Sequence, residues 1–395
     1  MTMAPITEPI DFSLVQGGPL FQLMMRAHLV EPSMKMLPRR MVAMIVVAWV
    51  PLLILTAMAG TAVGGEGVPF LYDLGAHARL LLCVPVLIAA EVIVHKRMRD
   101  TVRQFIDRRI VAVDDQPKFN ELVQSAMRLR NSALAEILLL ACVVVGIGPL
   151  GHRYVSFDVQ SWFSQPVGDQ TRLSPAGYWY LFVSLTIFRF LVFRWYFRIL
   201  VWYRFLWQVS RKIPLCLNAL HPDRAGGLGF LANSVFAFQP LLLAHMIALS
   251  GILGGRILNE HAKLPQFQLE IVFWIIALII LVLGPLLFFA GKLAETKRAG
   301  LREYGVVASR YVADFHRKWV EGRFTNTEPI LGTADIQSLA DLSNSFETVS
   351  DMRILPFGKT AVVQLAITSA LPLAPLLLTV MPLEQLIARA LGIFL

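Results

Sequence analysis

Four arginines occur within one apolar stretch of the chain: Arg189, Arg194, Arg198 and Arg204. At 100° per residue they would project over about half of a helix surface, and Arg189 would lie roughly 20 Å along a helix that starts at Ala176. An arginine inside hydrocarbon costs about 2.5–3.5 kcal/mol, so it should face a partner or water. The spacing favours a basic lining for an anion path or an acidic headgroup. Alternatively, Arg198 and Arg204 extend to the membrane interface.

Two acids occur in other apolar stretches, and both are expected at the same depth as Arg194 and Arg198. They are Glu91 and Glu136. One hypothesis is that ion pairs hold three helices together, and the other is a role in proton or cation coupling. His245, near the middle of a further apolar stretch, either extends a polar path or is a packing residue.

A glycine-rich loop, His221–Phe230, precedes one of the apolar stretches. Its side chains His221, Asp223 and Arg224 could bind a phosphate or transfer a proton, and free N–H groups at a helix entrance favour anions. The alternative is a turn in which Asp223 caps or pairs locally. No P-loop, nucleophile-elbow or metalloprotease motif occurs. We therefore assign no catalytic residue, metal ligand or cofactor, and an enzyme is not the favoured interpretation.

The composition excludes a soluble protein. Apolar residues make up 56% of the 395 residues and charged residues 16%, against about 45–50% and about 25% in soluble domains. The mean hydropathy is +0.61. The net charge of +9 is typical of a membrane protein that keeps Lys and Arg on its cytoplasmic side, so no nucleic-acid partner is expected. The three cysteines lack a paired motif and are interpreted as buried thiols.

The apolar stretches predict an all-α fold, a polytopic bundle of about seven transmembrane helices with a small helical cytoplasmic layer. The expected spans are Met41–Gly60, Leu80–Val94, Ser132–Leu150, Ala176–Phe197, Ser234–Leu253, Ile271–Ala290 and Thr360–Leu383. Seven spans divide the remaining chain between two sides. Lys and Arg total 26 on the side of the N-terminal tail and 6 on the other, which predicts a cytoplasmic N-terminus and a periplasmic C-terminus.

The predicted organisation has four parts. Residues 1–40 form a cytoplasmic tail, 41–290 hold helices one to six with a cytoplasmic helical hairpin at 95–131, 291–359 form a cytoplasmic helical segment, and 360–395 hold the seventh span and an outer interfacial helix. Apolar stripes in 291–359 need a partner, which is each other, another subunit or the membrane surface. We expect a homo-oligomer in contact with the bilayer and anionic lipid headgroups.

Three segments carry a resemblance to a known family. They are His221–Leu231 (HPDRAGGLGFL), Leu301–Gly305, and Glu328–Phe346, whose ADIQSLADLSNSFE stretch runs to Glu347. They resemble an uncharacterised family of bacterial multi-pass inner-membrane proteins, from about the first span to the end of the chain. The resemblance implies the bacterial inner membrane and no particular activity.

Three functions compete on this sequence. The favoured one is a channel- or transporter-like permeation path, for anions, lined by the fourth span. It rests on Arg189 and on prolines inside spans, which transporters use to expose backbone. The second is a membrane scaffold or assembly factor for envelope machinery, based on the apolar stripes. The third is a lipid-modifying enzyme that uses the His221–Phe230 loop.

Overall fold

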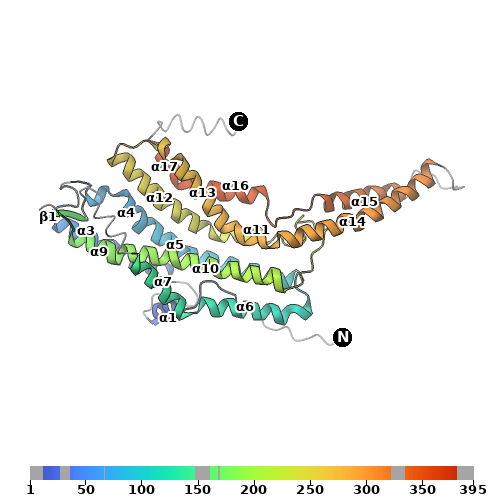
Figure 1. Cartoon of the computed structure of the whole chain (residues 1–395), viewed down its shortest axis with the longest axis horizontal. Helices are drawn as coiled ribbons and strands as arrows, with labels where there is room; N and C mark the ends of the chain where they lie inside the picture. Colours follow the sequence, from blue (N-terminus) through green and yellow to red (C-terminus); the bar gives the residue numbers. More distant parts are fainter. Residues whose placement is uncertain are drawn as a thin grey trace.

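The fold, seen in a computed structural model, is built almost wholly from helices (Figure 1). The structure describes residues 12–26, 36–65, 67–146, 161–167, 170–321 and 334–379. Within them, the strands are β1 (Ser164–Val167) and β2 (Gln170–Leu173), an antiparallel pair at one end of the molecule. Helices dominate because they satisfy their backbone hydrogen bonds internally, as a bilayer requires.

Six helices in the described part are long and apolar enough to cross a membrane. The first three are α2 (Leu37–Ala48) with α3 (Val50–Met58); α4 (Leu74–His77), η2 (Ala78–Cys83) and α5 (Val84–Asp107); and α9 (Pro175–Trp179), η4 (Tyr180–Ser184) and α10 (Leu185–Lys212). The others are α11 (Leu231–Val235), η5 (Phe236–Phe238) and α12 (Gln239–Asn259); η6 (Leu264–Phe267), α13 (Gln268–Leu283), η7 (Gly284–Phe289) and α14 (Ala290–Phe315); and α16 (Lys359–Ala370), η9 (Leu371–Leu373) and α17 (Ala374–Leu377).

The predicted span Ser132–Leu150 is helical over α7 (Ala133–Val145). These 13 residues are fewer than the roughly 20 that cross a hydrocarbon core, and residues 147–150 lie outside the described part. Seven spans therefore stay a prediction, as does the outer interfacial helix, since residues 380–395 are not described.

The predicted second span ends at Val94, and the apolar spacing beyond it indicates that the helix continues; α5 does continue, to Asp107. Its buried residues recur every three to four positions, from Leu87 through Glu91 and Val94 to Met98, so one stripe faces the core along the whole helix. The charged residues after Val94 occupy the remaining faces. The mean hydropathy falls after Val94 because charged residues follow, but the helical spacing of the buried residues continues beyond it.

The prolines mark where helical segments begin. Pro240 lies at the first turn of α12, Pro285 in the 3₁₀ segment η7, and Pro372 and Pro375 at the starts of η9 and α17. Proline lacks an N–H and tolerates the first turn of a helix, where that donor has no partner. The spans therefore change helical type at these points rather than ending.

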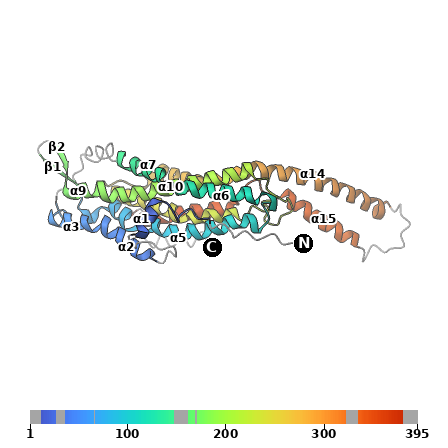
Figure 2. The same cartoon turned by 90° about the horizontal axis from the view of Figure 1, so that it is seen from below.

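The segment 291–359 includes a long helical hairpin, which we call the arm. It consists of α14, η8 (His316–Val320) and α15 (Ala334–Ser350), and it extends away from the bundle (Figures 1 and 2). Lys318 donates a hydrogen bond to Asp335 across it. Val306, Val307 and Val312 are about half exposed. Whether the arm forms the predicted cytoplasmic layer stays untested.

The N-terminal segment packs into the bundle, which the sequence did not indicate. Phe12 is buried against Trp202 and Phe205 of α10, and Leu14 is also buried. Ser13 Oγ lies 2.8 Å from His95 Nδ1 on α5. The described residues 12–18 are therefore part of the core rather than a free tail. Residues 1–11 and 27–35 lie outside the described part. Helix α1 (Pro19–Arg26) follows the buried segment.

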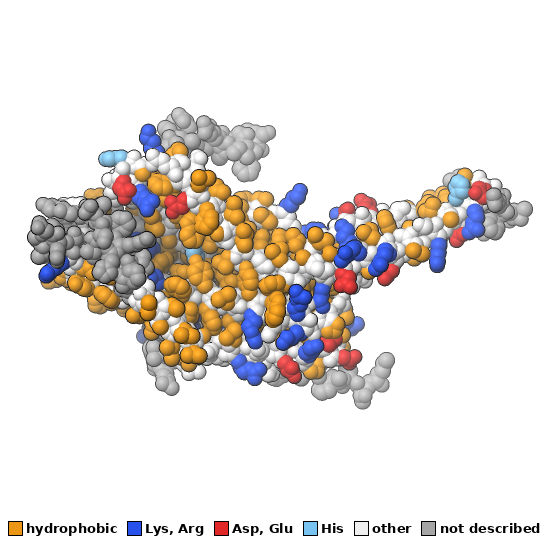
Figure 3. All heavy atoms as spheres, in the orientation of Figure 1, with side chains coloured by type: hydrophobic (Ala, Val, Ile, Leu, Met, Phe, Trp, Pro, Cys, Tyr) orange, Lys and Arg blue, Asp and Glu red, His pale blue; other side chains and the backbone are white. Residues whose placement is uncertain are grey.

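Hydrophobic side chains cover most of the bundle face seen in Figure 3. Lys, Arg, Asp and Glu gather on the arm and on the adjoining end of the bundle. Exposed residues on the apolar helices include Leu269, Ile276 and Ile280. Apolar surface of this extent is rare on soluble monomers and is typical of a surface that contacts lipid or another chain.

Candidate functional site

Helix α10 holds all four arginines, and they face different neighbours because of the helical period. Arg189 and Arg194 differ by about 140° around the helix, whereas Arg194 and Arg198 differ by about 40°. Arg194 and Arg198 therefore point together toward α5. Arg204 donates to Ser125 Oγ on α6 (Gln116–Arg130) at 3.2 Å.

Arg194 and Arg198 belong to a buried ion network. Arg198 Nη2 donates to Glu91 Oε1 at 2.8 Å, and Arg194 Nη1 lies 3.6 Å from the same oxygen. Arg194 Nη2 lies 3.5 Å from Glu136 Oε1 on α7. The Arg198 guanidinium also covers the Trp195 ring at 4.7 Å. The four side chains that the sequence placed at similar depth are thus brought together.

Arg40 of α2 is a fifth member of the network. Arg40 Nη1 donates to Glu91 Oε2, and both side chains are 5% exposed. The predicted span begins at Met41, which left Arg40 in the predicted tail, whereas α2 begins at Leu37. The helical period is the signal that could have included it. The network therefore connects α2, α5, α7 and α10.

The five members described here, three guanidinium groups and two carboxylates, carry a summed formal charge of +1. Arg40 Nε and Nη2 are buried and lack a hydrogen-bond partner among the described residues. Burying these charges costs several kcal/mol per ion, which their mutual attraction offsets only in part. We interpret the network as a device that sets the relative positions of four helices.

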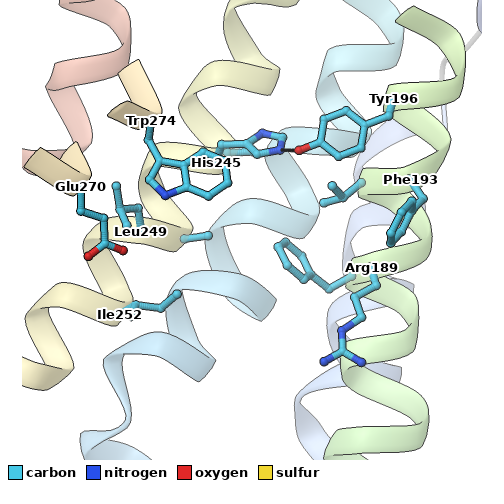
Figure 4. Close-up of a pocket in the computed structure, with 12 residues that line it drawn as sticks. Arg189, Phe193, Tyr196, His245, Leu249, Ile252, Glu270 and Trp274 are labelled. Atoms are coloured by element: carbon cyan, nitrogen blue, oxygen red, sulfur yellow. Dashed lines mark hydrogen bonds between the residues drawn. The ribbon is translucent and has the colours of Figure 1, made fainter. Parts of the chain in front are cut away.

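Arg189 lies in a separate cleft formed by α10, α12 and α13 (Figure 4). The cleft has a volume of about 290 Å³. Among the described residues that line it, only Arg189 and Glu270 are formally charged at neutral pH. The lining consists of Phe188, Arg189, Val192, Phe193, Tyr196, Ala244, His245, Ala248, Leu249, Ile252, Glu270 and Trp274.

Arg189 has no polar partner in the described part of the chain. Its Nη1 is buried and makes no hydrogen bond. Glu270, on the other wall, is exposed and forms no ion pair with it among the described residues. Figure 4 shows the Arg189 side chain reaching along α10 away from Tyr196 and His245. An unpaired guanidinium in an apolar cleft can accept an anion without first breaking an existing bond.

Tyr196 and His245 close the other end of the cleft and are hydrogen-bonded to each other. His245 Nδ1 is 2.7 Å from the Leu241 carbonyl, which can only accept, so Nδ1 carries the hydrogen. With the imidazole neutral, its Nε2 accepts from the Tyr196 hydroxyl at 2.6 Å. His245 therefore offers no free donor to a ligand in this arrangement.

The loop His221–Phe230 is a locally bonded turn. Asp223 accepts the N–H groups of Ala225, Gly227 and Gly229 at 2.8, 3.1 and 2.8 Å. Gly227 has a φ of +98°, a conformation that glycine adopts without strain. Partial burial alone would raise the pKa of Asp223, but these donors and nearby His221 outweigh it and hold the pKa below its usual value.

The same loop connects the arm to the bundle. Arg224 pairs with Asp351 at 2.9 Å, and its carbonyl accepts the Arg353 N–H at 2.7 Å. Arg353 Nη2 also donates to the Asp223 carbonyl at 2.9 Å. Thus His221, Asp223 and Arg224 lie close together, but their bonds serve the turn and the base of the arm. The loop precedes α11, whereas the cleft lies along α12.

Six helices are long and apolar enough to cross a membrane, and many of their apolar residues are exposed. The protein therefore belongs to the class of helical integral membrane proteins. No protein-family model, curated protein or solved structure matches the chain. The resemblance to a bacterial membrane family therefore stays a prediction. The residues that the structure describes contain no group of three or more His, Cys, Asp or Glu placed to hold a metal ion.

Proposed function

We propose that this protein is a transporter-like anion carrier of the bacterial inner membrane, in which Arg189 binds the anion and the permeation path follows α10. The observation that supports this most is the buried, unpaired Nη1 of Arg189 in the cleft lining. Arg189 is partly buried, and a buried guanidinium nitrogen without a partner costs free energy, so a ligand that accepts from Nη1 would account for it.

The proposal is narrower than the one drawn from the sequence. Arg194 and Arg198 are engaged by Glu91 and Glu136, so they do not line this anion site. They hold α10 against α2, α5 and α7 while Arg189 faces α12 and α13. We keep the cytoplasmic N-terminus and periplasmic C-terminus as part of the proposal, on the strength of the Lys and Arg distribution.

The test is anion movement in proteoliposomes that contain the full chain. We would follow chloride, inorganic phosphate, acetate and a fluorescent phosphatidylglycerol that is quenched from one side. At least one should move with the wild type. Arg189→Gln should slow it roughly tenfold or more, because a charge-assisted contact is lost, and Arg189→Lys should slow it less.

Arg204→Gln is the matched control, since it removes an arginine from the same helix outside the cleft. It should leave the rate unchanged. The proposal is wrong if no anion of the panel moves, or if Arg189→Gln transports as fast as the wild type.

A second candidate, a membrane scaffold, is favoured by the arm. Its half-exposed apolar residues, such as Val307 and Val312, and its acidic helix α15 form a surface that another chain can cover. Crosslinking with charge reversal at Asp341 or Glu347 tests this. If reversal leaves every crosslink unchanged, the arm is no docking surface. A homo-oligomer would appear in the same experiment as a crosslink between two copies.

The lipid-modifying enzyme gains no support from the described residues. Both carboxylate oxygens of Asp223 accept backbone N–H groups, and the Arg224 guanidinium pairs with Asp351. A general base or phosphate clamp needs these groups to be available.

A further inference from the structure

Resting on the proposed function, we propose that the anion bound by Arg189 is the headgroup of a membrane amphiphile, which enters the cleft sideways from the lipid. The headgroup contacts the guanidinium, and part of one hydrocarbon chain occupies the apolar space between α10, α12 and α13. The ligand class is an anionic lipid or fatty acid rather than a water-soluble anion.

The lining of the cleft favours an amphiphile over a small anion. Apart from Arg189 and Glu270, its polar groups include Tyr196 and His245, and these are committed to each other. A small hydrated anion would have to exchange its water shell for one guanidinium and at most the indole N–H of Trp274, which is unfavourable in an otherwise apolar site. An amphiphile avoids this exchange in part, because its chain gains the apolar contacts while its headgroup meets the cation.

The cleft also opens toward the membrane. Three wall residues are also exposed on the membrane-facing surface: Phe193 at 39%, Ile252 at 38% and Trp274 at 38%. They come from α10, α12 and α13, so the opening lies between helices rather than at an aqueous end of the bundle (Figure 4). A molecule that is already dissolved in the bilayer reaches such an opening by lateral diffusion.

The length and volume of the cleft fit part of one hydrocarbon chain. Arg189 and Tyr196 are separated by about 10 Å along α10, at 1.5 Å per residue, and the Tyr196–His245 pair ends the path. A cleft of about 290 Å³ is at the lower end of small-ligand pockets, which run from about 300 to 1,000 Å³. It therefore accommodates a headgroup contact and part of one chain, while the rest of the amphiphile stays in the bilayer.

The headgroup would lie toward the end of the bundle where α9 begins. In Figure 4 the Arg189 guanidinium points away from Phe193 and Tyr196, toward the start of α10. Glu270, near the start of α13, is exposed at the rim of the cleft. With the proposed topology, this end faces the periplasm, so the ligand comes from the outer leaflet.

The experiment is native mass spectrometry of the full chain in neutral detergent. The probes are phosphatidylglycerol, phosphatidylcholine with the same chains, and glycerol 3-phosphate as the headgroup without a chain. We expect the wild type to retain one phosphatidylglycerol in preference to phosphatidylcholine and to retain no glycerol 3-phosphate at equal concentration.

Two variants separate the headgroup from the chain. Arg189→Gln should weaken phosphatidylglycerol retention by roughly ten- to a hundredfold, the range for a lost charge-assisted hydrogen bond, and Arg189→Lys should recover part of it. Ala248→Phe fills the cleft without changing any charge and should weaken retention as well. Arg204→Gln should retain the lipid like the wild type, and circular dichroism verifies that each variant is folded.

The outcomes distinguish this inference from the proposed function. If glycerol 3-phosphate binds as well as phosphatidylglycerol, or if Ala248→Phe binds the lipid normally, the amphiphile is excluded and an anion site at Arg189 stands. If Arg189→Gln and Arg189→Lys retain phosphatidylglycerol with the wild-type affinity and the wild-type preference over phosphatidylcholine, the lipid lies elsewhere and both proposals are wrong.

Discussion

Arg198 and Arg189 lie on the same helix, but their guanidinium groups have different surroundings. Arg198 donates to Glu91, covers Trp195 and is 3% exposed. Arg189 lines a cleft and has a buried nitrogen with no partner among the described residues. Arginines in one apolar helix thus follow two designs. Each guanidinium of the network contacts a carboxylate, whereas that of Arg189 contacts none among the described residues.

The ion network shows why residue type alone cannot separate these designs. Arg194 and Arg189 have similar apolar neighbours in the sequence, and only the helical period places them on different faces. The carboxylates that decide the matter come from α5 and α7. Their contact with α10 forms only in the tertiary structure. It depends on the packing of several helices, which no local pattern contains.

The largest effect is expected from Glu91→Ala. It would leave Arg40, Arg194 and Arg198 without their shared carboxylate. Breaking a buried pair on one side costs about 3–5 kcal/mol. The free energy of unfolding, measured by denaturant titration in detergent, should fall by this amount. A loss below about 1 kcal/mol would mean that water or another group satisfies the network.

Arg198→Leu should have a smaller effect, about 2 kcal/mol, since it removes one charged hydrogen bond. The remaining network, with two arginines and two carboxylates, would be neutral. The same unfolding measurement provides the comparison. Should Arg198→Leu destabilise more than Glu91→Ala, charge balance is not what controls the network.

The turn at Asp223 offers a third design, a carboxylate satisfied by backbone N–H groups outside the spans. Because its folded pKa is lowered, it contributes stability that is fully present above its unfolded pKa of about 3.9 and is lost as pH falls through the lower, folded value. Thermal unfolding measured from about pH 4 downward should show this loss. In Asp223→Asn the pH dependence should be weaker, and an equal slope would exclude Asp223 as its source.

Glu270→Gln should produce the smallest change. Removing a negative charge from the rim of the cleft lowers the repulsion that an anion meets, so binding at Arg189 should strengthen by about twofold, as expected for an exposed charge. Weaker binding would instead indicate a ligand that carries a cation. The measurement is lipid retention at matched ionic strength, and raising the salt concentration should reduce the effect.

Sequence reasoning recovered the elements better than their partners. Hydropathy located the six membrane-length helices, but the spacing of the arginines grouped Arg189 with Arg194 and Arg198 as one lining, and the structure separates them. Sequence reasoning missed Arg40 because hydropathy windows begin at the first apolar run, and it missed Trp274 and Tyr196 because aromatic residues in spans carry no distinctive pattern. It also treated Phe12 as part of a tail, since a single buried aromatic residue before the first span gives no periodic signal.

The arm illustrates the same limit. Its apolar stripes predict helices that need partners, and α14 and α15 do contact each other. The exposure of Val306 and Val307 shows that this contact covers only part of the apolar surface. A stripe specifies that a face is apolar, but how much of it a neighbour covers depends on how the two helices cross.

The central claim is that Arg189 is unpaired because it binds an anion. The most direct measurement is Arg189→Leu, in which stability without ligand and phosphatidylglycerol retention are determined on the same preparation, with Arg198→Leu beside it. The account predicts that Arg189→Leu unfolds at the same or a higher temperature than the wild type, since an uncompensated charge is removed, and that it loses lipid selectivity. A variant that is as destabilised as Arg198→Leu and still selects phosphatidylglycerol would contradict it.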